Sequence, residues 1–259
     1  MRKHKEILII PDSHARMDAP NDRFSWAGEF ALDRQPNAII NIGDMADMTS
    51  LSMYDIGKLP AEGRRYEDDI HASHNACHLF NRAIQRYNNT HTKWKKKKYQ
   101  PTMVITLGNH ENRIPRACNE DPKLEGKLSL RDLAYESYGW EVIPYLQPYV
   151  YEDIAFQHYF TSGVLGRPIG GDNHAATLVK KGLMSCVQGH SHTRDFSELT
   201  DAIGRKRFGL VVGCYYDHPD HFTTEADRYW RGLVYLHDVQ NGQAEPEFLA
   251  FDYLKRKYG

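Results

Sequence analysis

The stretch Val104-Ile105-Thr106-Leu107-Gly108-Asn109-His110-Glu111-Asn112-Arg113 sets an apolar run directly before a cluster of polar side chains. The run is rich in β-branched residues, which predicts a buried strand, and it breaks at Gly108. In open α/β sheets the ligand crevice lies outside the carboxyl ends of the strands, so Asn109, His110 and Arg113 indicate a functional site. A polar turn after a strand also favours Gly and Asn, so this stretch alone leaves both interpretations open.

Two earlier apolar runs end in the same way. Residues 7–10 are followed by Asp12 and His14, and residues 38–42 are followed by Asp44. Side chains at i and i+2 of an extended chain point to the same side, so Asp12 and His14 can reach one ion. A strand, helix, strand series implies right-handed crossovers and a largely parallel sheet. The fold class is therefore α/β, with three polar loops at one sheet edge.

The remaining hydrophobic pattern predicts one domain over residues 1–259, with residues 48–101 as a helical, basic insertion between the second and third strands. Helices are expected from Asn21 to Arg34, over 66–87, from Ser129 to Tyr138, and over 173–181 with Gly182 as the C-cap. Further strands are expected over 140–143, 149–151, 154–160 and 185–188, and antiparallel ones over 208–213, 233–239 and 247–253.

Composition limits the function classes. The chain has 259 residues, 41% of them hydrophobic, so it can bury a substantial core. Lys and Arg (33) nearly balance Asp and Glu (34), so a case for nucleic acid must rest on local patches. The run Lys93 to Lys98 contains Trp94 and is either a solvated end of an element or a phosphate-tracking patch.

Localisation is expected to be cytoplasmic, with no membrane partner. The four cysteines are scattered without a CxxC pair, which fits reduced thiols. The apolar run Ile7 to Ile10 is too short for a signal segment or a membrane span. The sequence leaves the oligomeric state open.

Seven oxygen and nitrogen donors lie at or near predicted strand ends, two of them in the segment Gly189-His190-Ser191-His192. They are Asp12, His14, Asp44, Asn109, His158, His190 and His192. Seven such ligands with one shared carboxylate suit two divalent transition metals, whereas a structural zinc closes with four ligands. A lone His such as His158 is more often a core residue, and His71, His74 and His78 fit a surface or interface role.

The order D-x-H, GDxxD, GNHE, H and GHxH, from residue 12 to residue 192, resembles the calcineurin-like metallophosphoesterases. The resemblance implies a layered α/β/β/α sandwich with helices outside two central sheets. It implies one metal on Asp12, His14 and His192, a second on Asn109, His158 and His190, and Asp44 as the bridge. His110 is similar to the family's general acid, Asp47 to the residue that orients it, and Arg113 to a phosphate contact.

Two positions depart from the family pattern. Asp47 is followed by Met48 rather than by Arg, which puts a second phosphate-binding Arg in doubt. His158 is followed by Tyr159 rather than by Gly, which leaves His174 as a competitor for the fourth motif. We prefer His158, because it is expected on a strand whereas His174 starts a helix.

The expected function is metal-dependent hydrolysis of phosphate esters, with a bridging hydroxide as nucleophile and His110 as general acid. Two ions drawn from Mn, Fe, Zn or Ni, with Mn favoured, are the implied cofactors. The expectation leans to a phosphodiesterase or nuclease, with a nucleic acid or nucleotide as the ester. A phosphomonoesterase is the alternative, and a non-catalytic metal or nucleic-acid binding module is the alternative of another class. Residues 215–218 and His221 line either the substrate groove or a surface loop.

Overall fold

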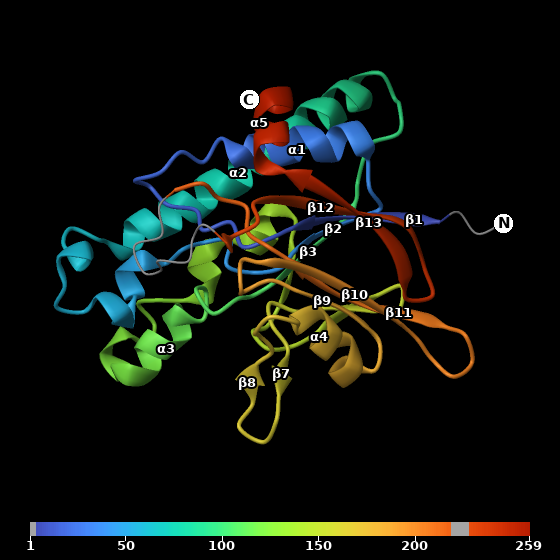
Figure 1. The fold of residues 1–259 in the computed structure, drawn as a ribbon. Helices are drawn as coiled ribbons and strands as arrows, with labels where there is room; N and C mark the ends of the chain where they lie inside the picture. Colours follow the sequence, from blue (N-terminus) through green and yellow to red (C-terminus); the bar gives the residue numbers. More distant parts are fainter. Residues whose placement is uncertain (1–3, 219–227) are drawn as a thin grey trace.

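The computed structural model describes residues 4–218 and 228–259, which form two stacked sheets with helices on the outer faces (Figure 1). The first sheet has the order β13-β12-β1-β2-β3-β4. Its strands β1 to β4 are parallel, whereas β12 runs antiparallel to β1 and β13. The bounds are β1 Lys5–Ile10, β2 Ala38–Asn41, β3 Thr102–Thr106, β4 Glu141–Ile143, β12 Gly232–Gln240 and β13 Gln243–Ala250.

The second sheet has the order β10-β11-β9-β6-β5. Its central strands β11, β9 and β6 are parallel, and the two edge strands are antiparallel to their neighbours. A separate hairpin of β7 and β8 projects beyond this sheet (Figure 1). The bounds are β5 Tyr149–Tyr151, β6 Ile154–Phe156, β7 Thr161–Ser162, β8 Arg167–Pro168, β9 Ser185–Gln188, β10 Arg194–Thr200 and β11 Lys206–Val212.

Helices cover the outer faces of both sheets. In Figure 1, α1, α2 and α5 lie over the first sheet and α4 lies under the second. The bounds are α1 Arg23–Arg34, α2 Tyr66–Lys93, α3 Arg113–Glu120, α4 His174–Gly182 and α5 Phe251–Tyr258. Short 3₁₀ helices occur at Thr49–Leu51, Met53–Asp55, Leu59–Ala61, Pro122–Leu124, Leu130–Leu133 and Tyr135–Tyr138.

Alternate residues of β1 enter different layers of the core, because successive side chains of a strand point to opposite faces. Leu8 packs with Phe24 and Phe80 of the covering helices. Ile7 and Ile9 instead belong to the apolar layer between the two sheets. A third apolar cluster lies beneath α4. The layers therefore follow the order α/β/β/α, which confirms the predicted fold class.

Several predicted elements have different ends. β6 stops at Phe156, so His158 follows the strand instead of lying on it. The helix predicted to end at residue 87 continues to Lys93. The helix predicted from Asn21 has Asp22 as its N-cap.

Three other predicted elements differ from the structure. The helix expected over 129–138 is two 3₁₀ helices, because Ala134 between them has a left-handed φ of 54°. Gly182 lies within α4, and Leu183 is the left-handed C-cap. The strand expected over 247–253 ends at Ala250, where α5 begins. Strand β10 and the β7–β8 hairpin were not predicted.

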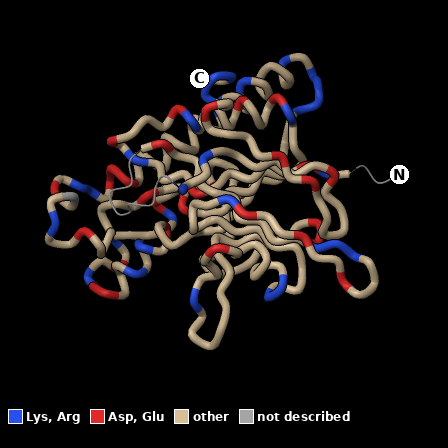
Figure 2. The backbone as a smooth tube through the Cα atoms, viewed as in Figure 1, with Lys and Arg blue, Asp and Glu red and all other residues tan. Residues whose placement is uncertain are grey.

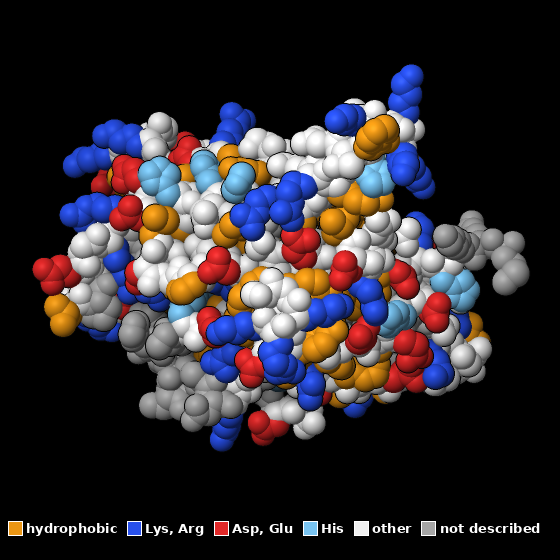
Figure 3. Space-filling view, turned by 90° about the horizontal axis from the view of Figure 1, so that it is seen from above, with side chains coloured by type: hydrophobic (Ala, Val, Ile, Leu, Met, Phe, Trp, Pro, Cys, Tyr) orange, Lys and Arg blue, Asp and Glu red, His pale blue; other side chains and the backbone are white. Residues whose placement is uncertain are grey.

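The exposed face over the helices is polar. Seen from above, it carries Lys, Arg, Asp and Glu with apolar side chains scattered among them (Figure 3). No helix among residues 4–218 and 228–259 combines the length and the apolar character needed to cross a bilayer. All four cysteines are buried free thiols, as the sequence predicted.

We predict that Gly28→Ala destabilises the fold. Gly28 lies where α1 crosses α2, and a Cβ there would overlap the backbone carbonyl of Phe80. Because packed backbone cannot shift freely, the free energy of unfolding should fall by about 1–3 kcal/mol, measured by urea denaturation. Gly170→Ala is the matched control, since nothing lies within 4 Å of a Cβ at that position. An equal effect of the two substitutions would contradict close packing of α1 on α2.

Candidate metal centre and active site

The ends of five strands bring the predicted ligands together. Asp12, Asp44 and Asn109 follow β1, β2 and β3 of the first sheet, and His158 and His190 follow β6 and β9 of the second. Parallel strands present their carboxyl ends at one edge, so loops distant in the sequence meet there. The site therefore lies at the seam between the two sheets.

The predicted ligands fall into two groups, in each of which the candidate ligand atoms lie within 4.8 Å of one another, and His14 also forms a third such group with Asp47 and His110. One group contains Asp12, His14 and His192, and the other contains Asp44, His158 and His190. The Asp44 Oδ2 atom is 3.2 Å from His158 Nε2 and 3.8 Å from His14 Nε2, so it lies between the groups.

Asn109 joins the second group through its side-chain oxygen. The Asn109 Oδ1 atom is 2.8 Å from His158 Nε2. His174, the competitor for the fourth motif, lies outside both groups: its Nε2 atom is 3.1 Å from Thr193 Oγ1. The structure thus places His158, rather than His174, among the candidate ligands.

Hydrogen bonds orient the imidazole rings. His158 Nδ1 is 3.0 Å from the carbonyl oxygen of Ile42, so Nδ1–H donates there and Nε2 faces Asp44. His192 Nδ1 is 3.1 Å from the hydroxyl of Tyr216, and its Nε2 is 3.2 Å from Asp12 Oδ2. Metal-binding histidines commonly use one ring nitrogen in this way while the other binds the ion.

Two buried donor atoms at this point, Asp12 Oδ1 and His14 Nε2, have no hydrogen-bond partner among residues 4–218 and 228–259. A buried polar atom left unpaired costs about 1–3 kcal/mol. Carboxylate, imidazole and amide donors are the set that divalent transition metals accept. The residues present therefore fit divalent cations.

The charge states of Asp44 and His190 suit cation binding, whereas His158 would have to lose a proton to bind a cation. Burial alone would raise the pKa of Asp44, but His110 and His158 hold that pKa well below the usual range. Burial and the nearby His158 lower the pKa of His190 to about 4, so its ring is neutral at pH 7. Burial opposes charge on His158 as well, but Asp44 and Asp12 raise its pKa to about 9.

Four of the candidate ligands adopt left-handed backbone conformations. The φ angles are 44° at His14, 51° at Asp44, 69° at His190 and 58° at His192. The expected extended geometry of Asp12 and His14 is therefore wrong, because the chain turns sharply at His14. Non-glycine residues in this region are strained by about 1–3 kcal/mol each and persist only where surrounding contacts fix them.

Arg23 supplies such contacts to the first loop. Its buried guanidinium donates from Nη2 to the carbonyl oxygens of Ser13, at 2.6 Å, and of His14, at 3.1 Å. The backbone N–H groups of Ser13 and His14 donate to the carbonyl oxygen of Asp44, which joins the first two loops.

Two glycines allow the carboxylates to approach the backbone. A Cβ on Gly108 would overlap Asp44 Oδ1, and a Cβ on Gly189 would overlap Asp12 Oδ1. Each carboxylate instead accepts a backbone N–H from the loop that contains this glycine. His110 N–H donates to Asp44 Oδ1 at 2.8 Å, and His190 N–H donates to Asp12 Oδ2 at 2.9 Å.

Glu111 is a site residue that sequence reasoning left without a role. Its Oε2 atom accepts the backbone N–H groups of Gly108, at 2.9 Å, and Asp44, at 3.0 Å. Its Oε1 atom accepts the N–H of Ala46 and the hydroxyl of Tyr135. Glu111 is fully buried and thereby connects the second and third loops. The only sequence signal was a carboxylate within the GNHE motif.

His110 and Asp47 form a hydrogen-bonded pair beside the two groups. His110 Nδ1 is 2.9 Å from Asp47 Oδ1, and its ring centroid is 4.4 Å from that of His14. His110 Nε2 is therefore the ring nitrogen that is not directed at Asp47. Although burial opposes it, hydrogen bonding and charge from His110 and the charge of His14 hold the pKa of Asp47 well below the usual range.

Arg113 lies beside this pair rather than standing free. Its Nη1 donates to the carbonyl oxygens of Asp47, at 2.8 Å, and Met48, at 3.2 Å. Its Nη2 is 3.1 Å from His110 Nε2. Met48, which replaces the family's Arg, is buried. Phosphate binding by Arg113 stays a prediction, because the backbone already occupies one side of the guanidinium.

A cavity of about 410 Å³ opens directly on these groups. His14, His110, His190 and His192 line it together with Tyr216 and His218 from the expected groove segment. Tyr215 is buried instead and donates its hydroxyl to the carbonyl oxygen of Arg23. His221 lies outside the described residues.

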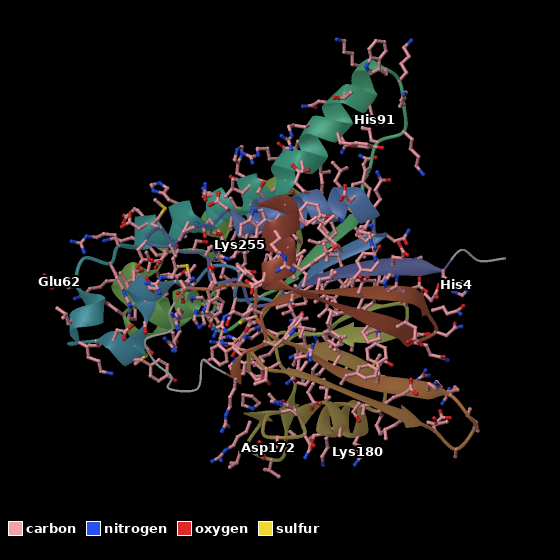
Figure 4. The ribbon with its side chains drawn as sticks, turned by 45° about the horizontal axis from the view of Figure 1, so that its top comes forward. His4, Glu62, His91, Asp172, Lys180 and Lys255 are labelled. Atoms are coloured by element: carbon pink, nitrogen blue, oxygen red, sulfur yellow. The ribbon has the colours of Figure 1, made fainter. Side chains whose placement is uncertain are left out.

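The lysine run is remote from this cavity. It follows the C-terminal end of α2, whereas Arg64 of the cavity lining precedes the N-terminal end. A helix of 28 residues spans about 42 Å. Figure 4 shows Glu62 just before one end of α2 and His91 near its other end, and Figure 2 shows the basic turn beyond that second end. The run therefore does not line the candidate site.

Comparison with known proteins gives remote structural similarity only. No protein-family model matches the chain, and no curated protein sequence matches it. A predicted phosphoesterase from Streptococcus pneumoniae TIGR4 is 11% identical at a TM-score of 0.36, covering 96% of this chain and 99% of that chain. Pseudomonas putida nuclease MPE is 12% identical at a TM-score of 0.33, covering 93% of this chain and 87% of that chain. Yfce, a phosphoesterase from E. coli, is 11% identical at a TM-score of 0.36, covering 94% of this chain and 99% of that chain. Similarities this remote assign no function, which must come from the site itself.

We predict that Glu111→Gln destabilises the protein. An amide cannot accept at both ends, so one N–H group that Glu111 now accepts would face an amide nitrogen. The free energy of unfolding, measured by urea denaturation in EDTA, should fall by about 1–3 kcal/mol. Glu120→Gln on the exposed side of α3 is the control and should change little. Stability equal to the wild type would show that Glu111 does not hold the two loops.

Proposed function

We propose that this chain hydrolyses phosphate esters with the help of two divalent cations. The observation that carries the proposal is the pair of donor groups around Asp44, set beside the His110–Asp47 pair on one cavity. A module that only binds metal or nucleic acid has no need of a histidine and an orienting carboxylate at this place.

The cations would be held by Asp12, His14 and His192 on one side and by Asn109, His158 and His190 on the other, with Asp44 between them. Oxygen and imidazole donors with no thiolate fit Mn, Fe, Zn or Ni, and Mn is the ion we favour. When bound, such ions neutralise the charge of the phosphate and make a water reactive at neutral pH.

His110 serves as the general acid. The water oxygen bonds to phosphorus, the P–O bond to the leaving group breaks, and the leaving alkoxide takes a proton from His110 Nε2. Arg113 Nη2 lies 3.1 Å from that nitrogen and can only donate, so the guanidinium has to move aside for the leaving group. Asp47 accepts the Nδ1–H bond, which holds the ring in place. A proton from the water restores the ring, so atoms and charges balance. Arg113 holds the backbone of Asp47 and Met48 and so positions the pair.

A phosphodiester is the preferred substrate. A monoester presents a terminal dianion, which needs cationic donors close to the metal centre. There Arg113 donates Nη1 to two backbone carbonyl oxygens, and Arg16 is paired with Asp18 and Asp47. The cavity also extends beyond the metal centre to Tyr54 and Lys58 of the insertion, which leaves room for a second ester arm.

We predict that the Mn²⁺-loaded protein hydrolyses bis-p-nitrophenyl phosphate with a higher kcat/KM than p-nitrophenyl phosphate. Release of p-nitrophenolate is followed by absorbance, and metal content is measured in the same samples. Faster turnover of the monoester would contradict the diester preference. No turnover of either ester with metal bound would contradict catalysis and favour the binding module.

We predict that His110→Asn retains bound metal but lowers kcat about 10²–10⁴-fold on a diester with an alkoxide leaving group. The loss should be smaller with p-nitrophenolate, which leaves without protonation. Metal content and kcat are measured on the same protein, with His78→Asn on the exposed side of α2 as control. Equal loss on both leaving groups, or no loss, would remove His110 from the acid role.

A further inference from the structure

The cavity continues from the metal centre into the insertion. It is lined by His110 and His192 of the metal centre and by Ser52, Tyr54, Lys58 and Arg64 of the insertion, which we call the insertion end. Its volume of about 410 Å³ lies within the range of sites that enclose a whole small ligand. A phosphate group at the metal centre would therefore leave the insertion end free for another part of the substrate.

Cationic donors at the insertion end are available to an anion. Lys58 is exposed, and its ammonium group has no carboxylate partner among the described residues. Arg64 uses Nη1 for Asp55 and for the carbonyl oxygen of Thr49. Within the described part of the chain, its Nε and Nη2 atoms make no hydrogen bond. The ion pair with Asp55 fixes the guanidinium and leaves one edge of it free.

A buried hydroxyl adds a neutral donor. The side-chain oxygen of Ser52 has no hydrogen-bond partner in the part of the chain that the structure describes, although Ser52 is only 7% exposed and lines the cavity. Buried hydroxyls are normally paired, so an unpaired one on a cavity wall points to a ligand.

Tyr54 gives this end of the cavity a free aromatic surface. Its side chain is 72% exposed at the cavity, and it stacks on no other ring of the described residues. Proteins that bind single-stranded nucleic acid combine cationic side chains along the backbone with aromatic rings on which bases stack. Lys58, Arg64 and Tyr54 supply both components.

We infer that Ser52, Tyr54, Lys58 and Arg64 form a subsite for the nucleotide next to the scissile diester of a single strand of nucleic acid. The base stacks on Tyr54, and the neighbouring phosphate binds Lys58, the free edge of Arg64 and the Ser52 hydroxyl. A base within a duplex is already stacked and paired, so the subsite selects single strands. This inference rests on the proposed phosphodiesterase function.

Three diesters with the same p-nitrophenolate leaving group test the subsite in the Mn²⁺-loaded full chain. They are methyl p-nitrophenyl phosphate, thymidine 5′-(p-nitrophenyl phosphate), and the latter with a 3′-phosphate. Relative to the methyl ester, Tyr54→Ala should lower kcat/KM for both nucleoside esters about tenfold, and Tyr54→Phe should restore it. Lys58→Ala should lower kcat/KM about fivefold more for the 3′-phosphorylated ester than for the unphosphorylated one.

Lys95→Ala in the remote basic turn is the matched control for Lys58→Ala and should leave all three rates unchanged. An equal fall for all three esters in the Tyr54 and Lys58 variants would overturn the subsite while leaving phosphodiesterase activity in place.

Binding separates failure of the subsite from failure of the proposed function. If the metal-loaded wild type hydrolyses none of the esters, the function fails, and the subsite is still tested by fluorescence anisotropy of a fluorescein-labelled oligothymidylate. Tyr54→Ala should then raise its Kd about tenfold, and Tyr54→Phe should not. An unchanged Kd for Tyr54→Ala, or tighter binding of a duplex of the same length, would overturn the inference.

Discussion

Buried negative charge is the constraint on which the rest of the site depends. Asp12, Asp44 and Glu111 are at most 1% exposed, and a buried carboxylate stays ionised only where donors and positive charge compensate it. The backbone N–H groups of His190 and His110 donate to the carboxylates of Asp12 and Asp44 and compensate part of their charge. Glu111 accepts N–H groups from two loops. Each loop thus stabilises a charge carried by another loop. The compensation that remains is what two cations would provide.

The sequence carried most of the fold because its central strands are buried on both faces. Ile7 and Ile9 face the second sheet while Leu8 and Ile10 face the helices, so the run had to be apolar throughout. Polar residues could then enter the core region only beyond the strand ends. For this reason Asp12, Asp44 and Asn109 could be singled out from the sequence before any distance was known, and the division between two donor groups followed from the family resemblance.

The sequence did not reveal features that depend on distant contacts. Glu111 acts through N–H groups of a loop more than sixty residues earlier, and no local pattern encodes such a partner. The left-handed angle at His14 is equally hidden, since Arg23 and the loop of Asp44 fix it from outside. Strand β10 escaped detection because it is a largely exposed edge strand without a buried run. Local rules fail where tertiary contacts override local preference.

Buried side chains line the cavity at the metal centre, and exposed side chains line it at the insertion. The groups proposed for catalysis are thereby separate from those proposed for substrate selection. The donors at the metal centre are buried, strained and held by backbone hydrogen bonds between loops, so they resist displacement. Tyr54 and Lys58 lie on a short exposed segment of the insertion, where side chains pack against little. A change in this segment can therefore alter the substrate without moving a candidate ligand. Substrate choice in this protein should accordingly depend on residues 48–65 far more than on the strand ends that carry the candidate ligands.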